Sequence, residues 1–354
     1  ADLAGISDFE RVLDRVRVWV HERQFQIGVQ LLQGLATPDE AGGVYSDIAE
    51  VSLAALLPAT IADFERRFGP PPGAGLAVVA LGRLGSREMT GASDLDLIMV
   101  YDAPRDGVSD GPKALPVPSY YARLSKAVIA ALTAPTAEGE LYAVDMRLRP
   151  SGRQGPVATS LAAFARYQRE DAWTWEHLAL TRARVVAGPP DLAERLTAAI
   201  AVALAQRQGA PDILRDLAEM RTRLDAARPR RDVWDVKAGP GGLLDIDLCL
   251  QAGALATGLA APVSPRATLG QLRAAGWLSV DGAGALGRCH DLLSAVQHIV
   301  RVAHEGPMKP GAIGTGLAET LTRATQSQSL AALETRLAAL TEAAAGVIDA
   351  RLRP

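Results

Sequence analysis

The stretch Ala77-Val-Val-Ala-Leu-Gly-Arg-Leu-Gly-Ser-Arg-Glu-Met-Thr-Gly-Ala-Ser-Asp-Leu-Asp-Leu-Ile-Met-Val-Tyr101 decides the fold that we expect. Its apolar ends predict short strands over residues 76–81 and 94–101, with a glycine-rich turn between them. Side chains of a strand alternate between two faces, so Asp94 and Asp96 point the same way. Like charges on a partly buried strand repel and lose hydration, and Mg²⁺ relieves both costs. The pattern favours metal-assisted phosphoryl chemistry; the alternative is a solvated edge strand with its acidic residues outward.

The bulk composition predicts a mainly helical protein. Of 354 residues, 48% are hydrophobic, 22% are charged and only 5% are aromatic, and the net charge of −3 gives no bulk attraction to nucleic acid. We expect Cys249 and Cys289 to be buried thiols of a cytoplasmic protein, without a disulfide. No apolar run approaches the roughly 18 residues that span a membrane, so no membrane association is expected. The chain begins at Ala1 without a methionine, and we expect a fragment of a longer protein.

Three regions follow one another along the chain. Apolar residues recur at helical spacing within residues 1–70, which we interpret as a helical lead-in. A run of prolines and glycines at Pro70–Gly75 ends it, and residues 71–158 read as a small α/β core. Residues 159–354 read as a helical region and C-terminal helical bundle, interrupted by an irregular stretch over 228–242. The expected fold class is α+β, a small sheet core flanked by helices and followed by a helical bundle.

A third acid lies in the expected third strand, residues 141–149. If this strand lies beside that of Asp94 and Asp96, Asp145 completes a cluster of three carboxylates. By the same alternation, Arg147 and Arg149 share the face of Asp145. They either form simple salt bridges with the acids or bind a triphosphate through charge-assisted hydrogen bonds.

Two glycine-rich segments are candidate phosphate contacts. Gly85 and Ser86 lie in a turn where the backbone can approach a phosphate, although a plain tight turn explains them equally well. Ser93 is placed to form a local hydrogen bond before the acidic pair. Lys237 belongs to a glycine-rich segment before a helix and could reach a phosphate. The alternative there is a flexible interdomain loop, with Asp245 and Asp247 as helix-capping acids.

Together these residues suit a transfer of a nucleotidyl group from ATP with two Mg²⁺ ions. One ion would activate an attacking hydroxyl, and the other would bind the triphosphate and stabilise the leaving pyrophosphate. Other kinds of site are poorly supported by the sequence. The five histidines show no zinc-protease spacing, the glycine turn lacks the lysine of a Walker loop, and no nucleophile elbow accompanies a triad.

The motifs resemble the nucleotidyltransferases of the DNA polymerase β superfamily and, within it, the glutamine synthetase adenylyltransferase family. The string Leu81-Gly-Arg-Leu-Gly-Ser-Arg-Glu-Met followed by Ser93-Asp-Leu-Asp carries the resemblance. It is supported by three further strings, Val144-Asp-Met-Arg-Leu-Arg-Pro-Ser-Gly152, Ala172-Trp-Thr-Trp-Glu-His177 and Thr181-Arg-Ala-Arg-Val-Val186, and by residues 237–251. The family commonly has lysine at position 83, glycine at 86 and glutamate at 247, where this chain has arginine, serine and aspartate.

The resemblance implies an activity and its partners. Members carry two homologous halves: one transfers AMP from ATP to a tyrosine hydroxyl of glutamine synthetase, and the other removes it by phosphorolysis, releasing ADP. This chain is similar to the C-terminal, adenylylating half. Carried over by position, Asp94 and Asp96 match the metal-binding pair, Asp145 the third carboxylate, and Gly85 and Ser86 the phosphate-contacting turn. Glutamine synthetase and a nitrogen-regulatory signal protein are the implied partners.

Two alternatives to an adenylylating enzyme stay open. One is the adenylyl-removing half, and the other is a non-catalytic module that binds a nucleotide or the signal protein. A template-directed polymerase is disfavoured by the net charge. Within the segment 173–186, we expect Trp173, Trp175 and Leu178 to be core residues, and Arg182 or Arg184 to pair with Glu176.

Overall fold

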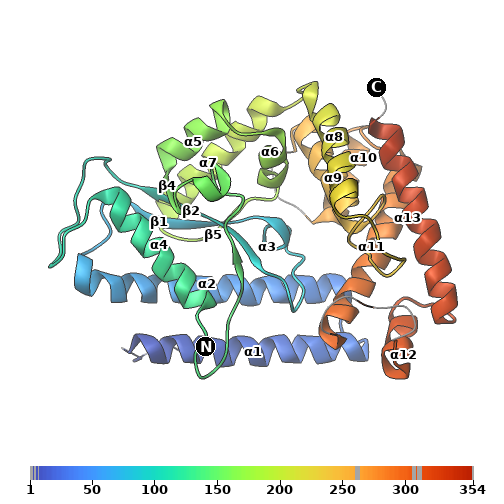
Figure 1. The fold of residues 1–354 in the computed structure, drawn as a ribbon, viewed down its shortest axis with the longest axis horizontal. Helices are drawn as coiled ribbons and strands as arrows, with labels where there is room; N and C mark the ends of the chain where they lie inside the picture. The colour runs from blue at the N-terminus through green and yellow to red at the C-terminus, as the bar shows by residue number, and fades with distance from the viewer. Residues whose placement is uncertain are drawn as a thin grey trace. The chain divides into compact units, whose positions relative to one another are not determined.

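The computed structural model describes residues 3, 5–6, 8–259, 264–304, 308 and 313–352. The chain divides into two compact units. The first, which we call the sheet unit, comprises Ala1–Gln26, Gly43–Met89 and Ser93–Gln206. The second, the helical unit, comprises Ile27–Gly42, Thr90–Ala92 and Arg207–Pro354. The expected α+β class with a mainly helical chain is confirmed (Figure 1).

The elements before residue 207 contain all the strands that the described residues form. In chain order they are α1 (Phe9–Gln33), α2 (Pro38–Phe68), β1 (Gly75–Ala80), α3 (Gly82–Ser86), β2 (Leu95–Asp102), α4 (Val117–Thr133), β3 (Val144–Asp145), the 3₁₀ turn η1 (Gly152–Gln154), β4 (Ala158–Ser160), α5 (Leu161–Glu170), α6 (Thr174–Leu180), β5 (Arg184–Ala187) and α7 (Pro190–Arg207).

The sheet is mixed and has the strand order β3-β2-β1-β5, with β4 also paired to β2. β1 and β2 are antiparallel, with Gly75 opposite Asp102 and Ala80 opposite Leu97. β3 and β4 both run parallel to β2 along the edge that β1 leaves open. All residues of β1 are buried, and β2 is buried except for Asp96 and its last residue, so the continuous apolar runs are explained by helices on both faces.

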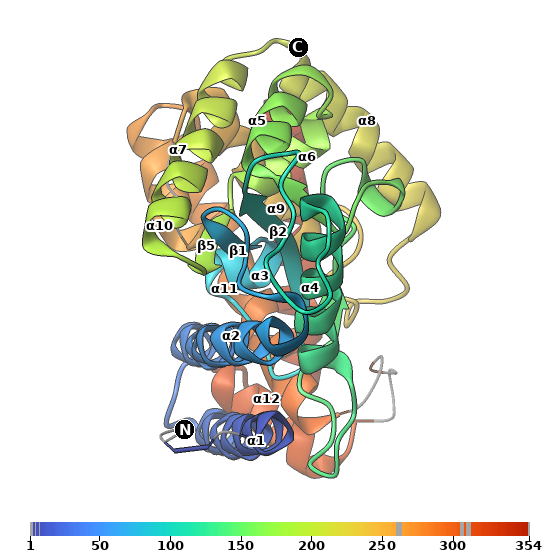
Figure 2. The same ribbon diagram turned by 90° about the vertical axis from the view of Figure 1, so that its left-hand side faces the viewer.

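Helices cover the sheet from two sides. Figures 1 and 2 both place α1 and α2 side by side on one side of the strands and α5 on the other. Arg17 of α1 is fully buried and donates hydrogen bonds to the carbonyl oxygens of Ala131 and Ala134, at the end of α4, and of Gly139. Burial lowers the pKa of Arg17, but the backbone carbonyls satisfy its guanidinium and fix α1 to the strand-bearing part of the chain.

Two sequence predictions about strands were wrong. The strand expected over residues 141–149 is only Val144–Asp145, because the chain turns away at Met146 into a loop that contains η1. The region after Ser160 was expected to be helical apart from residues 228–242, but Arg184–Ala187 forms β5 against β1. A four-residue strand flanked by helices is too short to show periodicity.

The helical unit is built around α11. Its elements are α8 (Asp212–Ala227), α9 (Leu243–Thr257), α10 (Pro265–Ala274), α11 (Val280–Ala303), α12 (Thr315–Ala324) and α13 (Leu330–Leu352). Leu286, Leu293 and Ile299 of α11 are fully buried and belong to one hydrophobic core with residues of the other helices. Cys249 and Cys289 are free, buried thiols, as predicted. Burial raises the pKa of both thiols to about 12, so they are inert packing groups.

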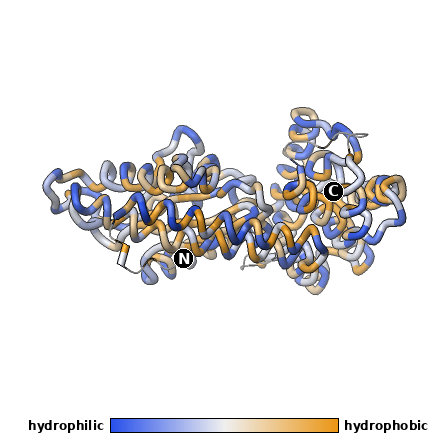
Figure 3. Tube along the Cα trace, turned by 90° about the horizontal axis from the view of Figure 1, so that it is seen from below, coloured by the Kyte–Doolittle hydropathy of each residue, from blue (hydrophilic) through white to orange (hydrophobic). Residues whose placement is uncertain are grey.

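Hydropathy along the chain agrees with this packing. In Figure 3, apolar and polar residues alternate along the helices, as in helices with one buried face. By length and composition alone, α2 could cross a membrane, with a mean hydropathy of 1.3 over its most apolar window. Half of that window is buried within the protein, and the core helix of a soluble protein passes the same test.

Candidate active site

Asp96 and Asp145 are direct neighbours on adjacent parallel strands. Asp96 of β2 is the register partner of Asp145 of β3, and Leu95 is that of Val144. Register partners in a parallel pair project from the same face, so the two carboxylates lie side by side. Asp94 directly precedes β2, two residues before Asp96, and its side chain is exposed. Within the sheet unit, Asp145 therefore lies next to Asp96, as predicted, with Asp94 two residues before Asp96.

Gly82 leaves room for the carboxylate of Asp96. Gly82 begins α3 with a positive φ of 52°, and a Cβ at this position would overlap Oδ2 of Asp96. The amide of Leu81 also donates a hydrogen bond of 2.9 Å to the carbonyl oxygen of Asp96. The first residue of α3 thus packs directly against Asp96 near the start of β2. This close contact explains why glycine occupies position 82.

Arg147 is the cationic partner of the acid cluster. Its backbone amide donates to Oδ1 of Asp145 at 2.8 Å, and its guanidinium Nε donates to Oδ2 at 2.6 Å. Partial burial acts to raise the pKa of Asp145, but these hydrogen bonds and the charges of Arg147 and Arg153 lower it overall. Asp145, together with the charges of Asp96 and Asp94, raises the pKa of Arg147. All three carboxylates therefore act on one guanidinium.

Arg149 does not share the face of Asp145, because β3 ends at Asp145. Its guanidinium donates instead to the carbonyl oxygens of Met146 at 2.8 Å, Arg153 at 3.2 Å and Gly155 at 3.3 Å. Arg149 therefore shapes the loop that carries Arg147 and Arg153 beside the acids. The expected neighbourhood of Arg147 and Asp145 is found, but that of Arg149 and Asp145 is wrong, since it assumed a strand that continued to residue 149.

Gly85 and Ser86 are buried in α3. A Cβ on Gly85 would overlap the carbonyl oxygen of Arg182, so glycine permits close packing of two backbone segments there. The hydroxyl of Ser86 donates to the carbonyl oxygen of Gly82 at 3.2 Å. Ser93 is half-buried in the extended residues before β2. These contacts are structural, and the phosphate-binding role of the three residues stays a prediction.

The sequence argument gave Arg184 no part in the site, but Arg184 connects α3 to two other elements. From β5 its Nε donates to the carbonyl oxygen of Gly85 at 2.8 Å, and its Nη2 donates to that of Leu84 at 2.7 Å. It also forms an ion pair with Glu50 of α2. Carbonyls at the end of a short helix lack helical partners, and Arg184 supplies them. The expected pairing of Arg182 or Arg184 with Glu176 was wrong for Arg184.

The tryptophans before and within α6 are exposed. Trp173 is 70% exposed and Trp175 is 41% exposed, so the prediction that they are core residues was wrong. Glu176 is among the buried residues of this segment, and it accepts hydrogen bonds from the Tyr167 hydroxyl at 2.9 Å and from the Trp173 amide at 2.9 Å. Leu178 is also buried, as predicted. Burial raises the pKa of Glu176, although both hydrogen bonds act to lower it. A capping box, recognisable as a glutamate at the third helical position, was the signal for this contact.

Lys237 lies in the helical unit, exposed, in the segment before α9. Nearby, Asp245 of α9 is buried and receives a bidentate ion pair from Arg221, with nitrogen–oxygen distances of 2.5 and 2.9 Å. It also accepts from the amide of Gly241, just before the first turn of α9, at 2.8 Å, so its contacts hold the segment that leads into the helix. The predicted contact of Lys237 with a phosphate stays a prediction.

The donor set of the three acids suits a hard divalent cation. Asp94, Asp96 and Asp145 offer only carboxylate oxygens, which Mg²⁺ prefers, and the exposure of Asp94 leaves the cluster open to solvent. A cation would offset the repulsion between three neighbouring acids. Arg147, whose side chain is 66% exposed, can swing away from Asp145 when a cation takes its place.

Comparison with known proteins agrees with this site. Residues 1–199 match the family model described as glutamate-ammonia ligase adenylyltransferase, and this segment contains all three acids. The chain belongs to this family. The resemblance seen in the sequence is thereby confirmed. Residues 215–307, in the helical unit, match a second family model, described as GlnD PII-uridylyltransferase.

Curated relatives of this adenylyltransferase family match nearly the whole chain. A protein of Mesorhizobium japonicum named bifunctional glutamine synthetase adenylyltransferase/adenylyl-removing enzyme is 40% identical over 343 residues, covering 95% of this chain and 34% of the relative. A protein of the same name from Rhizobium meliloti is 41% identical, and the match covers 96% of this chain and 35% of the relative. Another from Brucella suis is 48% identical, and the match covers 72% of this chain and 26% of the relative. The chain spans about a third of the length of the relatives it matches.

Proposed function

We propose that this chain transfers AMP from ATP to a tyrosine hydroxyl of glutamine synthetase and releases pyrophosphate. The observation that carries the proposal is the register pair Asp96–Asp145 with Asp94 beside it, three carboxylates around one exposed arginine. The family and the motifs over residues 144–186 support the adenylylating half. Because the proposed reaction belongs to nitrogen regulation, we place it in the cytoplasm, under the control of a PII-type signal protein.

The residues of the sheet unit would divide the work as follows. Asp94, Asp96 and Asp145 would hold Mg²⁺, which when bound polarises the phosphate and favours ionisation of the attacking hydroxyl. Arg147 lowers the pKa of Asp145 and favours its ionised form, so its oxygens are ready to accept a cation. Arg147, released from Asp145, would turn towards the phosphates and neutralise the charge that develops on them. Arg153, whose charge also acts on Asp145, is placed to assist, and Arg149 would hold the loop.

The removal of AMP is the second candidate function. The curated relatives carry both activities in their name, and the chain covers about a third of each. The same three acids would serve a phosphorolysis in which inorganic phosphate attacks the phosphorus of the adenylyl-tyrosine, the tyrosine oxygen leaves, and ADP is formed. The products separate the two reactions, because transfer from ATP yields pyrophosphate and removal from the modified synthetase yields ADP.

The test is to incubate the chain with Mg²⁺, ATP labelled on its α-phosphate and glutamine synthetase, and to map the label. We expect label on one tyrosine and an equal amount of pyrophosphate. Asp96→Asn should lower the rate at least a hundredfold while the unfolding temperature stays the same or rises, since a repulsive charge is removed. Asp145→Asn should lower the rate by a similar factor but lower the unfolding temperature slightly, because it also removes the ion pair with Arg147. Near-normal labelling by either variant would refute the catalytic assignment.

Asp102→Asn is the matched control. Asp102 ends the same strand, far along β2 from the acid cluster, and pairs with Arg195 at 2.5 Å. The same chemical change there should leave the transfer rate within about twofold of the unmodified chain, because the pair is partly exposed and worth little. A non-catalytic module would instead bind ATP without producing any pyrophosphate, and the three aspartates would then have no effect on turnover.

A further inference from the structure

Ser151 has a strained backbone and lies in the loop that carries the arginines of the candidate active site. It directly precedes η1 and adopts a φ of 62°, in the left-handed region that residues other than glycine rarely occupy. Such a conformation is unfavourable and persists only where neighbouring groups hold it. Arg147 lies four residues before Ser151 and Arg153 two residues after it, so the position of Ser151 bears on both arginines.

Tyr167 of α5 is the group that holds Ser151. Burial and Glu176 raise the pKa of Tyr167, whereas the backbone amide and the hydroxyl of Ser151 act in the opposite direction, because both hydrogen-bond to the Tyr167 hydroxyl. The end of the loop is attached to the same helix, since Ser160 of β4 accepts a hydrogen bond of 3.2 Å from the Ala163 amide in the first turn of α5. α5 therefore holds the loop at its middle and at its end.

Glu176 of α6 fixes the Tyr167 hydroxyl in turn. The hydroxyl donates to both carboxylate oxygens of Glu176, at 2.9 and 3.0 Å. Glu176 is only 5% exposed, and the backbone amide of Trp173 donates to its Oε2 at 2.9 Å. Because the hydroxyl gives its single proton to this carboxylate, its lone pairs are left for the two donors of Ser151. A chain of contacts therefore runs from the first turn of α6 to the middle of the loop.

The two arginines at the end of this chain of contacts act on the acids. Arg147 forms an ion pair with Asp145, and the charges of Arg147 and Arg153 both lower the pKa of that carboxyl, against the effect of its burial. Arg149 donates a hydrogen bond of 3.2 Å to the carbonyl oxygen of Arg153, which ties the segment 149–153 together internally. A displacement of Ser151 would therefore move the guanidinium groups relative to the acids.

We propose that Tyr167 is a positioning residue for the transfer of AMP, which holds Ser151 and thereby keeps the two arginines of the loop beside the acids. The inference rests on the proposed function, because it assigns those arginines to the phosphates of ATP. Tyr167 touches neither the acids nor the substrate in this scheme and acts only through the loop. Its loss should lower kcat more than it raises the KM for ATP, since the arginines neutralise charge that develops as the bond between the α- and β-phosphates breaks.

The experiment compares Tyr167→Phe with the unmodified chain in the assay of AMP transfer. The substitution removes only the hydroxyl, and we expect kcat to fall about ten- to hundredfold while the KM for ATP changes by less than about threefold. Hydrogen exchange at residues 146–157 should become faster, because the loop loses its contact with α5.

Tyr120→Phe is the matched control. Tyr120 is a buried tyrosine of α4 in the same unit, and its hydroxyl donates to the carbonyl oxygen of Gly69 at 2.9 Å. Its loss removes a comparable hydrogen bond outside the loop. The variant should keep kcat within about twofold of the unmodified chain and leave hydrogen exchange at residues 146–157 unchanged.

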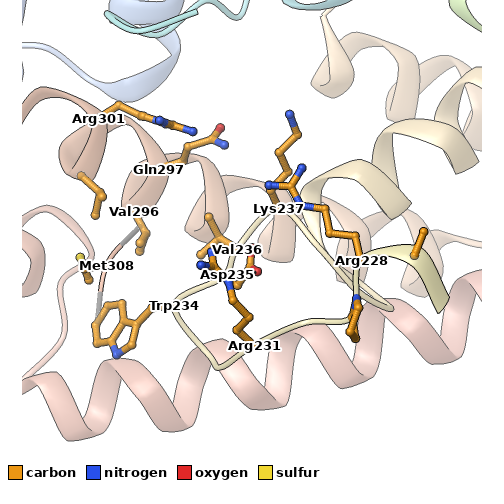
Figure 4. Close-up of a pocket in the computed structure, with 13 residues that line it drawn as sticks. Arg228, Arg231, Trp234, Asp235, Val236, Lys237, Val296, Gln297, Arg301 and Met308 are labelled. Atoms are coloured by element: carbon orange, nitrogen blue, oxygen red, sulfur yellow. Dashed lines mark hydrogen bonds and ion pairs between the residues drawn. The ribbon is translucent and has the colours of Figure 1, made fainter. Parts of the chain in front are cut away.

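A second comparison separates positioning from a general loss of structure. In a chain that carries Arg147→Gln and Arg153→Gln, Tyr167→Phe should lower the remaining rate by less than about twofold, because no guanidinium is left to position. A merely structural role would give the same loss in both backgrounds. The control background carries Arg228→Gln and Arg301→Gln, at two exposed arginines that line a cavity of the helical unit (Figure 4). In that background Tyr167→Phe should keep its full effect.

The proposal is overturned if Tyr167→Phe keeps kcat within about twofold of the unmodified chain, or if it causes equal losses with and without the loop arginines. An unmodified chain that transfers no AMP would instead contradict the proposed function. Hydrogen exchange would then still test the contact with the loop, and unchanged exchange at residues 146–157 in Tyr167→Phe would show that Tyr167 does not hold it.

Discussion

The carboxylate of Asp96 occupies the space where a side chain on Gly82 would begin. Gly82 opens α3 and Asp96 lies on β2, so the turn and the acidic end of the strand are shaped by one steric relationship. Glycine at this position therefore serves the geometry of the acid cluster directly.

Gly82→Ala tests this relationship. The new methyl group would overlap Oδ2 of Asp96, and alanine would have to adopt a φ of 52°. We expect a loss of about 1–3 kcal/mol in the free energy of unfolding, measured by urea denaturation, and a fall in AMP transfer as Asp96 is displaced. Gly43→Ala in α2 is the control, since a Cβ there meets no atom within 4 Å. It should leave stability unchanged or raise it by up to about 1 kcal/mol.

Arg184→Met tests the anchoring of α3. The substitution keeps the length of the side chain but leaves the carbonyl oxygens of Leu84 and Gly85 without their donor. We expect a loss of about 2–3 kcal/mol in the free energy of unfolding, together with reduced transfer. Arg195→Met, which removes a more exposed ion pair with Asp102, should cost less than about 1 kcal/mol. If both variants lost the same free energy of unfolding, the hydrogen bonds from Arg184 to the carbonyl oxygens would add no more stability than an exposed ion pair.

Glu176→Gln tests a pH dependence. Burial raises the folded-state pKa of Glu176 above its ordinary value, so the folded protein holds this proton more tightly than the unfolded chain. Stability from this group is thus greatest below pH 4.5 and declines as the pH rises through the raised pKa. The free energy of unfolding of the variant, minus that of the unmodified chain, should therefore increase between pH 4 and pH 7, within a range of about 1 kcal/mol.

Denaturation at a series of pH values measures that difference. Tyr167, which donates to Glu176, keeps its proton throughout this range because burial raises its pKa. Glu138→Gln, at an exposed position of the same unit, is the control and should show a flat difference. A flat difference for Glu176→Gln as well would contradict the raised pKa.

Asp245→Asn tests the buried ion pair of the helical unit. The side chains of Arg221 and Asp245 are only 13% and 7% exposed, and Arg221 would keep a buried charge with one carboxylate fewer. We expect a loss of about 3–5 kcal/mol in the free energy of unfolding. Glu219→Gln, which removes an exposed pair with Arg223 on the same helix, should cost less than about 0.5 kcal/mol. Thermal unfolding of both variants would suffice for this comparison.

Much of the site could be predicted from local sequence. Side-chain alternation placed Asp94 and Asp96 on one face, and Asp145 was expected to join them if its strand lay beside theirs, which the register of β2 and β3 shows. The helical lead-in expected over residues 1–70 is found as α1 and α2, which end at Phe68.

The errors have two sources, local irregularity of the chain and contacts between segments distant in the sequence. Arg149 alternates with Asp145 in the sequence, but its hydrogen bonds to loop carbonyls accompany a turn that no periodicity reveals. Trp173 and Trp175 were assigned to the core on hydrophobicity, whereas the polar Glu176 occupies the buried position. Arg184 pairs with Glu50, 134 positions earlier, and no local signal predicts such a partner.

β3 and β4 pair with the same edge of β2, one with Leu95 and Asp96 and the other with Met99 to Tyr101. The chain between them, residues 146–157, leaves and returns to a single strand. This loop is therefore attached at both ends to the same strand, β2. If β2 moved relative to β1, Asp96, Asp145 and the arginines of this loop would move together with it. The spacing between the acids and the guanidinium groups of Arg147 and Arg153 would then stay the same.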